Sequence, residues 1–185
     1  AVSSISADLH KYGYAAKGAS TLLHRSAAQH AHQVFQFDDW PAGGMSTPTV
    51  AGTRPGGAIA SAWAVLHYLG VEGYRERTRR ALSARRRIAR GVEALGLRIH
   101  GDPQLALMAY GMPEGDPVPI FAVWKGLYER GWFSGVVQRP DGIHLMLSPA
   151  HDEVVEAYLG DVAECLAAAR RAGGAHETAA PVRYA

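Results

Sequence analysis

The sequence has little that would tie it to an oxidising compartment or a membrane. Cys165 is its single cysteine, so no disulfide can form within the chain. No run approaches the roughly 20 apolar residues that a helix needs to cross a bilayer, and no signal peptide is recognisable. These absences favour a cytoplasmic protein, and the abundance of Ala, Arg and Gly favours a bacterial source.

A strong charge of one sign is also lacking. The chain has 19 Lys and Arg against 17 Asp and Glu, a net charge of +2, which is too weak to indicate nucleic acid. The densest basic run, from Arg75 to Arg90, is typical of a helix with a solvated basic side. Nine histidines occur, including His24, His30 and His32, but no Cys/His or Glu/His group has the spacing of a tight metal site. We therefore expect neither nucleic acid nor a metal.

The composition is that of an ordinary globular protein. The chain has 185 residues, of which 48% are hydrophobic and 19% charged, enough for one domain and a second small lobe. It opens with Ala-Val-Ser-Ser-Ile-Ser-Ala-Asp, which reads as a strand already under way and lacks a starting methionine. We expect the chain to be part of something longer.

The first third predicts a hairpin, a loop and a helix. Short strands are expected over residues 3–7 and 19–24, joined by a glycine-containing loop. Residues 25–34 read as a short helix or an irregular connector. The stretch 38–57 is rich in Gly, Pro, Ser and Thr and predicts a long ordered loop. Residues 58–69 are apolar nearly all round, which predicts a buried helix ended by Gly70.

The remainder predicts a long helix over residues 72–95, followed by a small α/β lobe and a loose tail from residue 173. The four tryptophans are expected in the core, and Cys165 is expected to be an inert packing residue. The lobe is expected to contain strands at 97–99, 105–110, 132–137 and 143–147, and helices at 118–130 and 151–172.

One lysine stands out for its surroundings. Lys11 follows the first strand, lies among small and aromatic residues, and precedes Gly13 and Gly18. This pattern is typical of a lysine presented into a cleft. A lysine that forms an imine must lose its proton, which partial burial or a second nearby cation favours. Lys17 is a candidate for that cation.

Two segments resemble a known family. The run Ser4-Ile-Ser-Ala-Asp-Leu-His-Lys-Tyr-Gly-Tyr-Ala-Ala-Lys-Gly-Ala-Ser20 is similar to the Schiff-base segment of sphingosine-1-phosphate lyases, in the pyridoxal-phosphate-dependent group II decarboxylase family. The block Gly43-Gly-Met-Ser-Thr-Pro-Thr-Val-Ala-Gly-Thr-Arg-Pro-Gly56 is similar to a second segment of the same family. The resemblance implies an α/β fold, the C-terminal part of a fold-type I enzyme. Residues 1–70 would end the large domain, 71–172 would form a connecting helix and the small domain, and 173–185 would be a tail.

The resemblance also implies roles for single residues. Lys11 matches the lysine that binds pyridoxal 5'-phosphate as a Schiff base, and His10 matches the residue beside it, near the cofactor phosphate. Lys17 matches a lysine that faces the phosphate of the substrate. The pair formed by Gly52 and Thr53 matches the residues that reach the cofactor phosphate of the partner subunit. Two further candidates for the site are Arg54, beside Thr53, and Tyr184 in the tail.

The implied activity is retro-aldol cleavage of sphingosine-1-phosphate to a long-chain aldehyde and phosphoethanolamine. The enzyme would be a homodimer with its active site at the interface. The family's pyridine-nitrogen carboxylate and glycine-rich phosphate loop lie in an N-terminal part that this chain lacks, so the chain alone is expected to be inactive. The block at Gly43–Ser46 is one residue shorter than in the family and has no aromatic residue.

Two alternatives stay open. An amino-acid decarboxylase of the same fold, close to glutamate decarboxylase, would share the His10-Lys11 pair but would generally lack a lysine at position 17. That residue favours the lyase. A non-enzymatic relative is the second alternative. The presence of both His10-Lys11 and Thr53-Arg54 argues against it.

Overall fold

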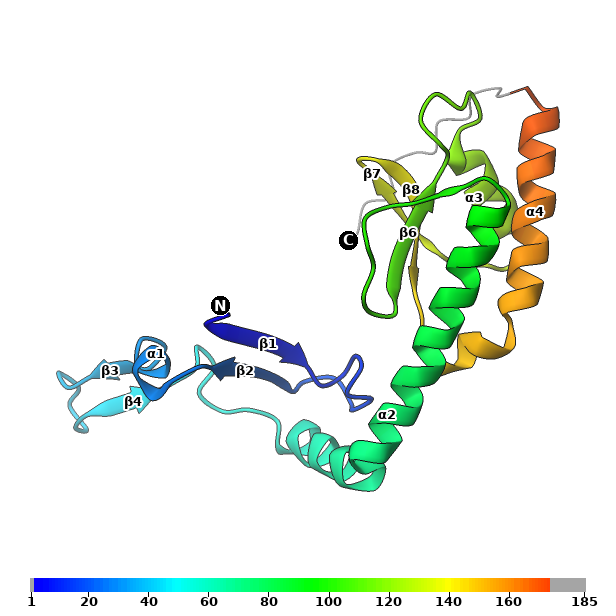
Figure 1. Cartoon of the computed structure of the whole chain (residues 1–185). Helices are drawn as coiled ribbons and strands as arrows, with labels where there is room; N and C mark the ends of the chain where they lie inside the picture. Colours follow the sequence, from blue (N-terminus) through cyan, green and yellow to red (C-terminus); the bar gives the residue numbers. More distant parts are fainter. Residues whose placement is uncertain (1, 174–185) are drawn as a thin grey trace. The chain divides into compact units, whose positions relative to one another are not determined.

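The computed structural model describes residues 2–173 of the chain (Figure 1). These residues divide into two compact units, and the boundary falls between Val71 and Glu72. Within the described range, no helix combines the length and the apolar character that a membrane span requires.

The N-terminal unit begins with the predicted hairpin. β1 (Ser4–Asp8) and β2 (Ser20–His24) pair antiparallel, with Ser4 opposite His24 and Asp8 opposite Ser20. Antiparallel strands can be joined by a short connection, whereas parallel strands need a long crossover. The segment that carries Lys11 therefore leaves β1 and returns at the same end of the ribbon.

A second hairpin lies partly in the segment expected to be a loop. After the short helix α1 (Ala27–Ala31), β3 (Phe35–Phe37) pairs antiparallel with β4 (Met45–Thr47). The prediction of a continuous loop over residues 38–57 is therefore wrong at β4. A strand of three residues is at the short limit for globular proteins, so its alternation is hard to recognise beside glycine and proline.

Helix α2 (Gly56–Ala94) is interrupted at Gly70, where the backbone has φ 55° and ψ −175°. A positive φ of this size is strained for residues with a Cβ and is readily adopted by glycine. The sequence predicts two helices divided at this glycine, and the break is confirmed.

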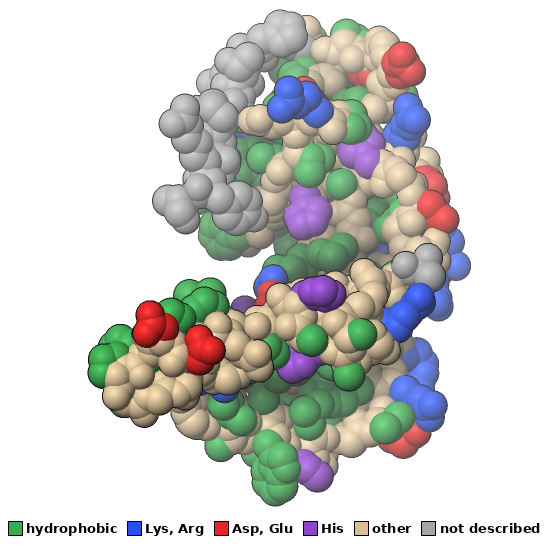
Figure 2. All heavy atoms as spheres, turned by 90° about the vertical axis from the view of Figure 1, so that its left-hand side faces the viewer, with side chains coloured by type: hydrophobic (Ala, Val, Ile, Leu, Met, Phe, Trp, Pro, Cys, Tyr) green, Lys and Arg blue, Asp and Glu red, His purple; other side chains and the backbone are tan. Residues whose placement is uncertain are grey.

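The expected burial of the first part of α2 is wrong. Trp63 is 65% exposed and Tyr68 is 86% exposed, while the small residues Ala58 and Ala62 are buried. Trp40, also expected in the core, is 57% exposed. Hydrophobic side chains are widely visible on the molecular surface in Figure 2. An apolar pattern predicts which side chains favour burial, but the residues that would cover them must also be present.

The C-terminal unit has the predicted α/β character. Its antiparallel sheet has the order β5-β6-β8-β7, and α3, α4 and the second part of α2 cover one face of this sheet (Figure 1). The strands are β5 (Arg98–Ile99), β6 (Leu107–Gly111), β7 (Gly135–Gln138) and β8 (Asp141–Met146), and the helices are α3 (Ile120–Glu129), the 3-10 helix η1 (Pro149–Glu153) and α4 (Val155–Arg171).

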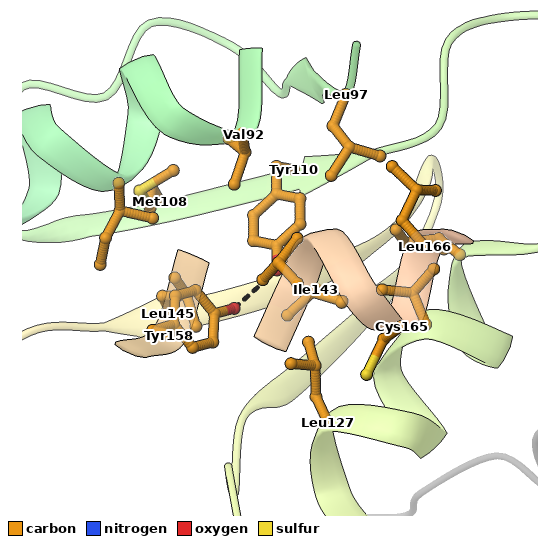
Figure 3. Packing of buried hydrophobic residues seen from close by; sticks show 14 of the residues in the cluster. Val92, Leu97, Met108, Tyr110, Leu127, Ile143, Leu145, Tyr158, Cys165 and Leu166 are labelled. Carbon is orange, nitrogen blue, oxygen red and sulfur yellow. Dashed lines mark hydrogen bonds between the residues drawn. The ribbon is translucent and has the colours of Figure 1, made fainter. Parts of the chain in front are cut away.

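The core of this unit surrounds a pair of buried tyrosines. The hydroxyl oxygens of Tyr110 in β6 and Tyr158 in α4 are 2.6 Å apart, and apolar side chains such as Leu127 and Ile143 enclose them (Figure 3). One hydroxyl donates to the other, so each of these buried oxygens has a hydrogen-bond partner. Cys165 is buried in the same cluster. Burial raises the pKa of its thiol, which agrees with an inert packing role.

The basic side of α2 is less solvated than expected. The guanidinium of Arg87 lies 3.1 Å from a carboxylate oxygen of Asp152 and 2.9 Å from one of Glu156. Arg80 similarly pairs with Glu153 at 2.8 Å. These pairs connect α2 to η1 and the start of α4, so part of the arginine run joins elements within the C-terminal unit.

The start of β7 is later than predicted because α3 is extended by its cap. Gly131 has φ 92°, and the backbone N–H of Trp132 donates to the carbonyl of Leu127 at 3.0 Å. This is the hydrogen-bonding pattern with which a glycine ends a helix. Trp132 therefore belongs to the cap, and the strand begins at Gly135.

We predict that Gly111→Ala destabilises the C-terminal unit. A Cβ at Gly111 would lie 2.4 Å from the backbone oxygen of Asp141, which cannot move without disturbing the pairing of β8. The free energy of unfolding should fall by about 1–3 kcal/mol, as for other overpacked sites. Urea unfolding followed by circular dichroism measures it. Gly160→Ala, in α4 with open space around the glycine, is the control and should raise stability by about 0.5–1 kcal/mol. Equal stability of the two variants would contradict the packing argument.

Candidate active site

Lys11 lies in a tight turn just after β1. Its backbone N–H donates to the carbonyl of Asp8 at 3.1 Å, and its own carbonyl accepts from Tyr14 at 3.0 Å. Gly13 fits here because a Cβ would lie 2.4 Å from the carbonyl oxygen of Leu9. The turn therefore restricts the backbone of Lys11 on both sides of the residue.

A carboxylate is the charged group that the structure places against Lys11. The Nζ atom of Lys11 lies 2.6 Å from Oδ2 of Asp8, and Ser20 Oγ donates to Oδ1 of the same carboxylate at 2.8 Å. Hydrogen bonds from Lys11 and then Ser20 lower the pKa of Asp8. The sequence suggests Lys17 as a neighbouring cation. It does not predict the carboxylate of Asp8 beside Lys11.

His10 has a buried nitrogen that lacks a partner. Among residues 2–173, no group forms a hydrogen bond with its Nδ1 atom, although this atom is shielded from solvent. A buried polar atom left without a hydrogen bond costs free energy, so such an atom in a native structure needs an explanation. A phosphate oxygen or a water beside His10 would satisfy it, which fits the expected place of the cofactor phosphate.

The second block forms a loop braced by threonines. Thr49 Oγ1 donates to the carbonyl of Ala51 at 2.7 Å and accepts from the guanidinium of Arg54 at 3.3 Å. Thr47 Oγ1 accepts from the backbone N–H of Thr49 at 3.3 Å. Arg54, a candidate for support of the site, thus braces the loop that carries Gly52 and Thr53.

The same loop is tied to the first hairpin through Gln33. Its side-chain amide donates to the carbonyl of Pro48 at 2.8 Å, and its Oε1 atom is 2.6 Å from Nε2 of His24 at the end of β2. The ring of His30 lies edge-on to that of His24, with centroids 5.5 Å apart. These two histidines therefore serve the packing of the loop. No cluster of three or more metal-ligating side chains occurs in residues 2–173.

The two blocks meet at the start of α2. The backbone N–H of Ala16 donates to Ser61 Oγ at 3.1 Å. Gly18 packs so closely on this helix that a Cβ would lie 3.1 Å from that of Ala58 and 3.5 Å from Cγ of Pro55. The residues that follow Lys11 therefore contact the residues that follow Thr53. This brings together segments that lie about forty positions apart in the sequence.

The remaining predicted residues lie where a ligand could reach them. Gly52 and Thr53 are exposed, and Lys17 is exposed beside Gly18, whose φ is 111°. Tyr184 lies outside the described residues. Sequence reasoning missed Asp8 and Ser20, because an i,i+3 spacing is a pairing signal on a helix and not across the end of a strand and a turn.

Comparisons with known proteins agree with the resemblance of the two segments. Sphingosine-1-phosphate lyases of Oryza sativa and Drosophila melanogaster are 38% and 40% identical to the chain, over 87% and 90% of its length. The chain spans about 30% of each of these relatives. No family model matches it.

Solved structures give the same answer. The sphingosine-1-phosphate lyase of Burkholderia pseudomallei superposes with a TM-score of 0.85 at 35% identity, over 93% of this chain and 39% of that one. A glutamate decarboxylase of Lactobacillus brevis superposes with a TM-score of 0.71 at 18% identity, over 90% of this chain and 40% of that one, which shows a shared fold alone. The chain is thus related to part of the sphingosine-1-phosphate lyases and has the fold of the C-terminal part of a fold-type I enzyme.

We predict that Thr49→Val loosens the loop of Gly52 and Thr53. The substitution keeps the shape of the side chain but removes the hydroxyl that bonds Ala51 and Arg54. Because each such bond contributes about 0.5–1.5 kcal/mol, amide hydrogen exchange in residues 50–54 should become about 2- to 10-fold faster. Exchange measured by mass spectrometry tests this. Thr78→Val, on an exposed position of α2, is the matched control, and an equal response in both variants would refute the bracing role.

Proposed function

We propose that a complete enzyme containing this chain is a pyridoxal-phosphate-dependent carbon–carbon lyase. It would cleave sphingosine-1-phosphate, or a similar phosphorylated long-chain base, to a long-chain aldehyde and phosphoethanolamine. The observation that carries the proposal is the contact between the segment after Lys11 and the segment after Thr53, through Ala16–Ser61 and Gly18–Ala58. Similarity to sphingosine-1-phosphate lyases over about 30% of their length supports it.

The residues of the N-terminal unit fit the cofactor. When bound, pyridoxal phosphate supplies an electron sink for the bond that breaks at the substrate. Lys11 would attach to it covalently from the rigid turn after β1, and Nδ1 of His10 would find the partner that it lacks among the described residues. Gly52 and Thr53, which are exposed, would contact the phosphate of the cofactor held by the partner subunit through their backbone and hydroxyl groups.

Lys17 would bind the phosphate group of the substrate. It lies in the exposed part of the loop whose next residue, Gly18, is pressed against α2. Because the backbone next to Lys17 is held by this contact, the ammonium group of Lys17 can reach only a limited region. Charge-assisted hydrogen bonds between lysine and phosphate are stronger than neutral ones, so one such residue can select a phosphorylated substrate. Tyr184 is a further candidate for contact with the substrate.

The proposal includes the assembly in which the chain would act. We infer a homodimer in which Gly52 and Thr53 face the cofactor of the partner subunit, with Arg54 holding their loop. The missing N-terminal part would supply the carboxylate at the pyridine nitrogen and the phosphate loop. Residues 1–70 would belong to the large domain and 71–172 to the small domain. A bacterial, cytoplasmic setting is part of the same proposal.

A decarboxylase acting on an amino acid such as glutamate is the second candidate. The likeness in fold to glutamate decarboxylase favours it, because the same scaffold positions the same cofactor in both. The two candidates differ in what the substrate carries. A phosphorylated base needs a cation such as Lys17 at the phosphate, whereas glutamate does not.

We predict that Lys11→Ala in the complete enzyme abolishes covalent attachment of pyridoxal phosphate. The visible absorbance of the attached cofactor should disappear, because alanine has no amine to bond the aldehyde carbon. Borohydride reduction followed by peptide mass spectrometry should locate the cofactor on Lys11 in the unsubstituted enzyme. Trapping of the cofactor on any other lysine of the complete enzyme would overturn the assignment.

We predict that Lys17→Ala retains the cofactor but lowers kcat/KM for sphingosine-1-phosphate. A hydrogen bond to a charged group contributes about 1.5–3 kcal/mol, so the loss should be about 10- to 100-fold. Aldehyde release measures it, and Lys125→Ala in α3 is the control. Carbon dioxide released from glutamate by the unsubstituted enzyme, without aldehyde from sphingosine-1-phosphate, would establish the decarboxylase instead.

A further inference from the structure

The carboxylate of Asp8 is held in place by two different partners. Asp8 is the last residue of β1, and the strand register places it opposite Ser20. Ser20 Oγ donates to Oδ1 at 2.8 Å, while Oδ2 lies 2.6 Å from Nζ of Lys11. Because Ser20 occupies one oxygen, the other is turned toward the lysine. Strand pairing therefore fixes the direction from which the Lys11 amine approaches the carboxylate of Asp8.

The lysine is also held at its backbone. The N–H of Lys11 donates to the carbonyl of Asp8, so one residue binds both ends of the lysine. The side chain of Lys11 remains 60% exposed and that of Asp8 31% exposed, which leaves the pair accessible to a ligand. The other titratable group that acts on Asp8 is His10, which also lowers the pKa of that carboxyl, as the smallest of the contributions.

We propose that Asp8 is the positioning residue of Lys11. Its carboxylate would hold the ammonium group of Lys11 whenever Nζ is not bonded to a cofactor. This inference rests on the proposed role of Lys11. An ammonium group paired with a carboxylate is not a nucleophile, since its lone pair is occupied by a proton. Asp8 therefore keeps the ammonium group of Lys11 in one position and lowers its reactivity toward other electrophiles.

Competitive acylation of the 185-residue chain tests the pair without any cofactor. The chain has three lysines, Lys11, Lys17 and Lys125, and mass spectrometry distinguishes their peptides. Trace acetic anhydride reacts with amines in proportion to their free, unprotonated form. Asp8→Asn should raise the acylation of Lys11 relative to Lys17 and Lys125 about two- to fivefold, the size expected for an exposed ion pair.

Two further variants separate positioning from a merely structural role. Asp8→Glu restores the charge and should return the acylation of Lys11 toward that of the unsubstituted chain. Asp39→Asn removes the same charge from the turn between β3 and β4 and should leave the ratio unchanged. A ratio that is equal in Asp8→Asn and the unsubstituted chain, or that responds equally to Asp39→Asn, would overturn the proposal.

The reciprocal measurement does not require a substitution at Asp8. Because the hydrogen bond from Lys11 lowers the pKa of Asp8, Lys11→Met should raise that pKa toward its ordinary value, and Lys17→Met should not. Carboxyl resonances followed by NMR report it, and a pKa that does not change in Lys11→Met would refute the pair. Borohydride trapping in the complete enzyme tests the role of Lys11 itself, so either idea can fail without the other.

Discussion

Backbone pairing between β1 and β2 determines the geometry around Lys11 in the candidate site. It sets Asp8 opposite Ser20, which aims one carboxylate oxygen at Lys11, and it starts the return segment that presses Gly18 onto α2. A shift of the register by one residue would turn every side chain of the hairpin to the other face. The position of the Lys11 amine therefore depends on five strand pairs and on a turn that glycine alone can fit at position 13.

The sequence predicts well those features that local chemistry decides. The hairpin, the break at Gly70 and the alternation of strands and helices after residue 96 follow from turn residues and periodicity, and the structure confirms them. It predicts poorly what depends on distant neighbours. The apolar pattern around Trp63 indicates burial, but nothing in the pattern identifies the residues that would cover that side chain.

The candidate site shows the same division. His10-Lys11 and Thr53-Arg54 are visible as motifs because the family resemblance marks them. The contacts that unite them are not, since Ala16–Ser61 joins a backbone amide to a serine that carries no distinctive signal. The pair of Asp8 and Lys11 was equally hidden, because an i,i+3 spacing has a known meaning on a helix but not across the end of a strand and a turn.

A shared fold does not determine which reaction an enzyme catalyses. The side chains around the candidate site must therefore distinguish the lyase from the decarboxylase. The scaffold that resembles a lyase with a TM-score of 0.85 also resembles a glutamate decarboxylase with a TM-score of 0.71. Both proposed enzymes would use Lys11 to bind the same cofactor, so Lys11 does not distinguish their substrates. Lys17 would distinguish the two substrates under the proposed function, because its ammonium group would bind a phosphate that glutamate lacks. If Asp8 controls the position of the Lys11 amine and Lys17 controls which substrate binds, the last residue of β1 acts on the cofactor and a residue shortly before β2 acts on the substrate.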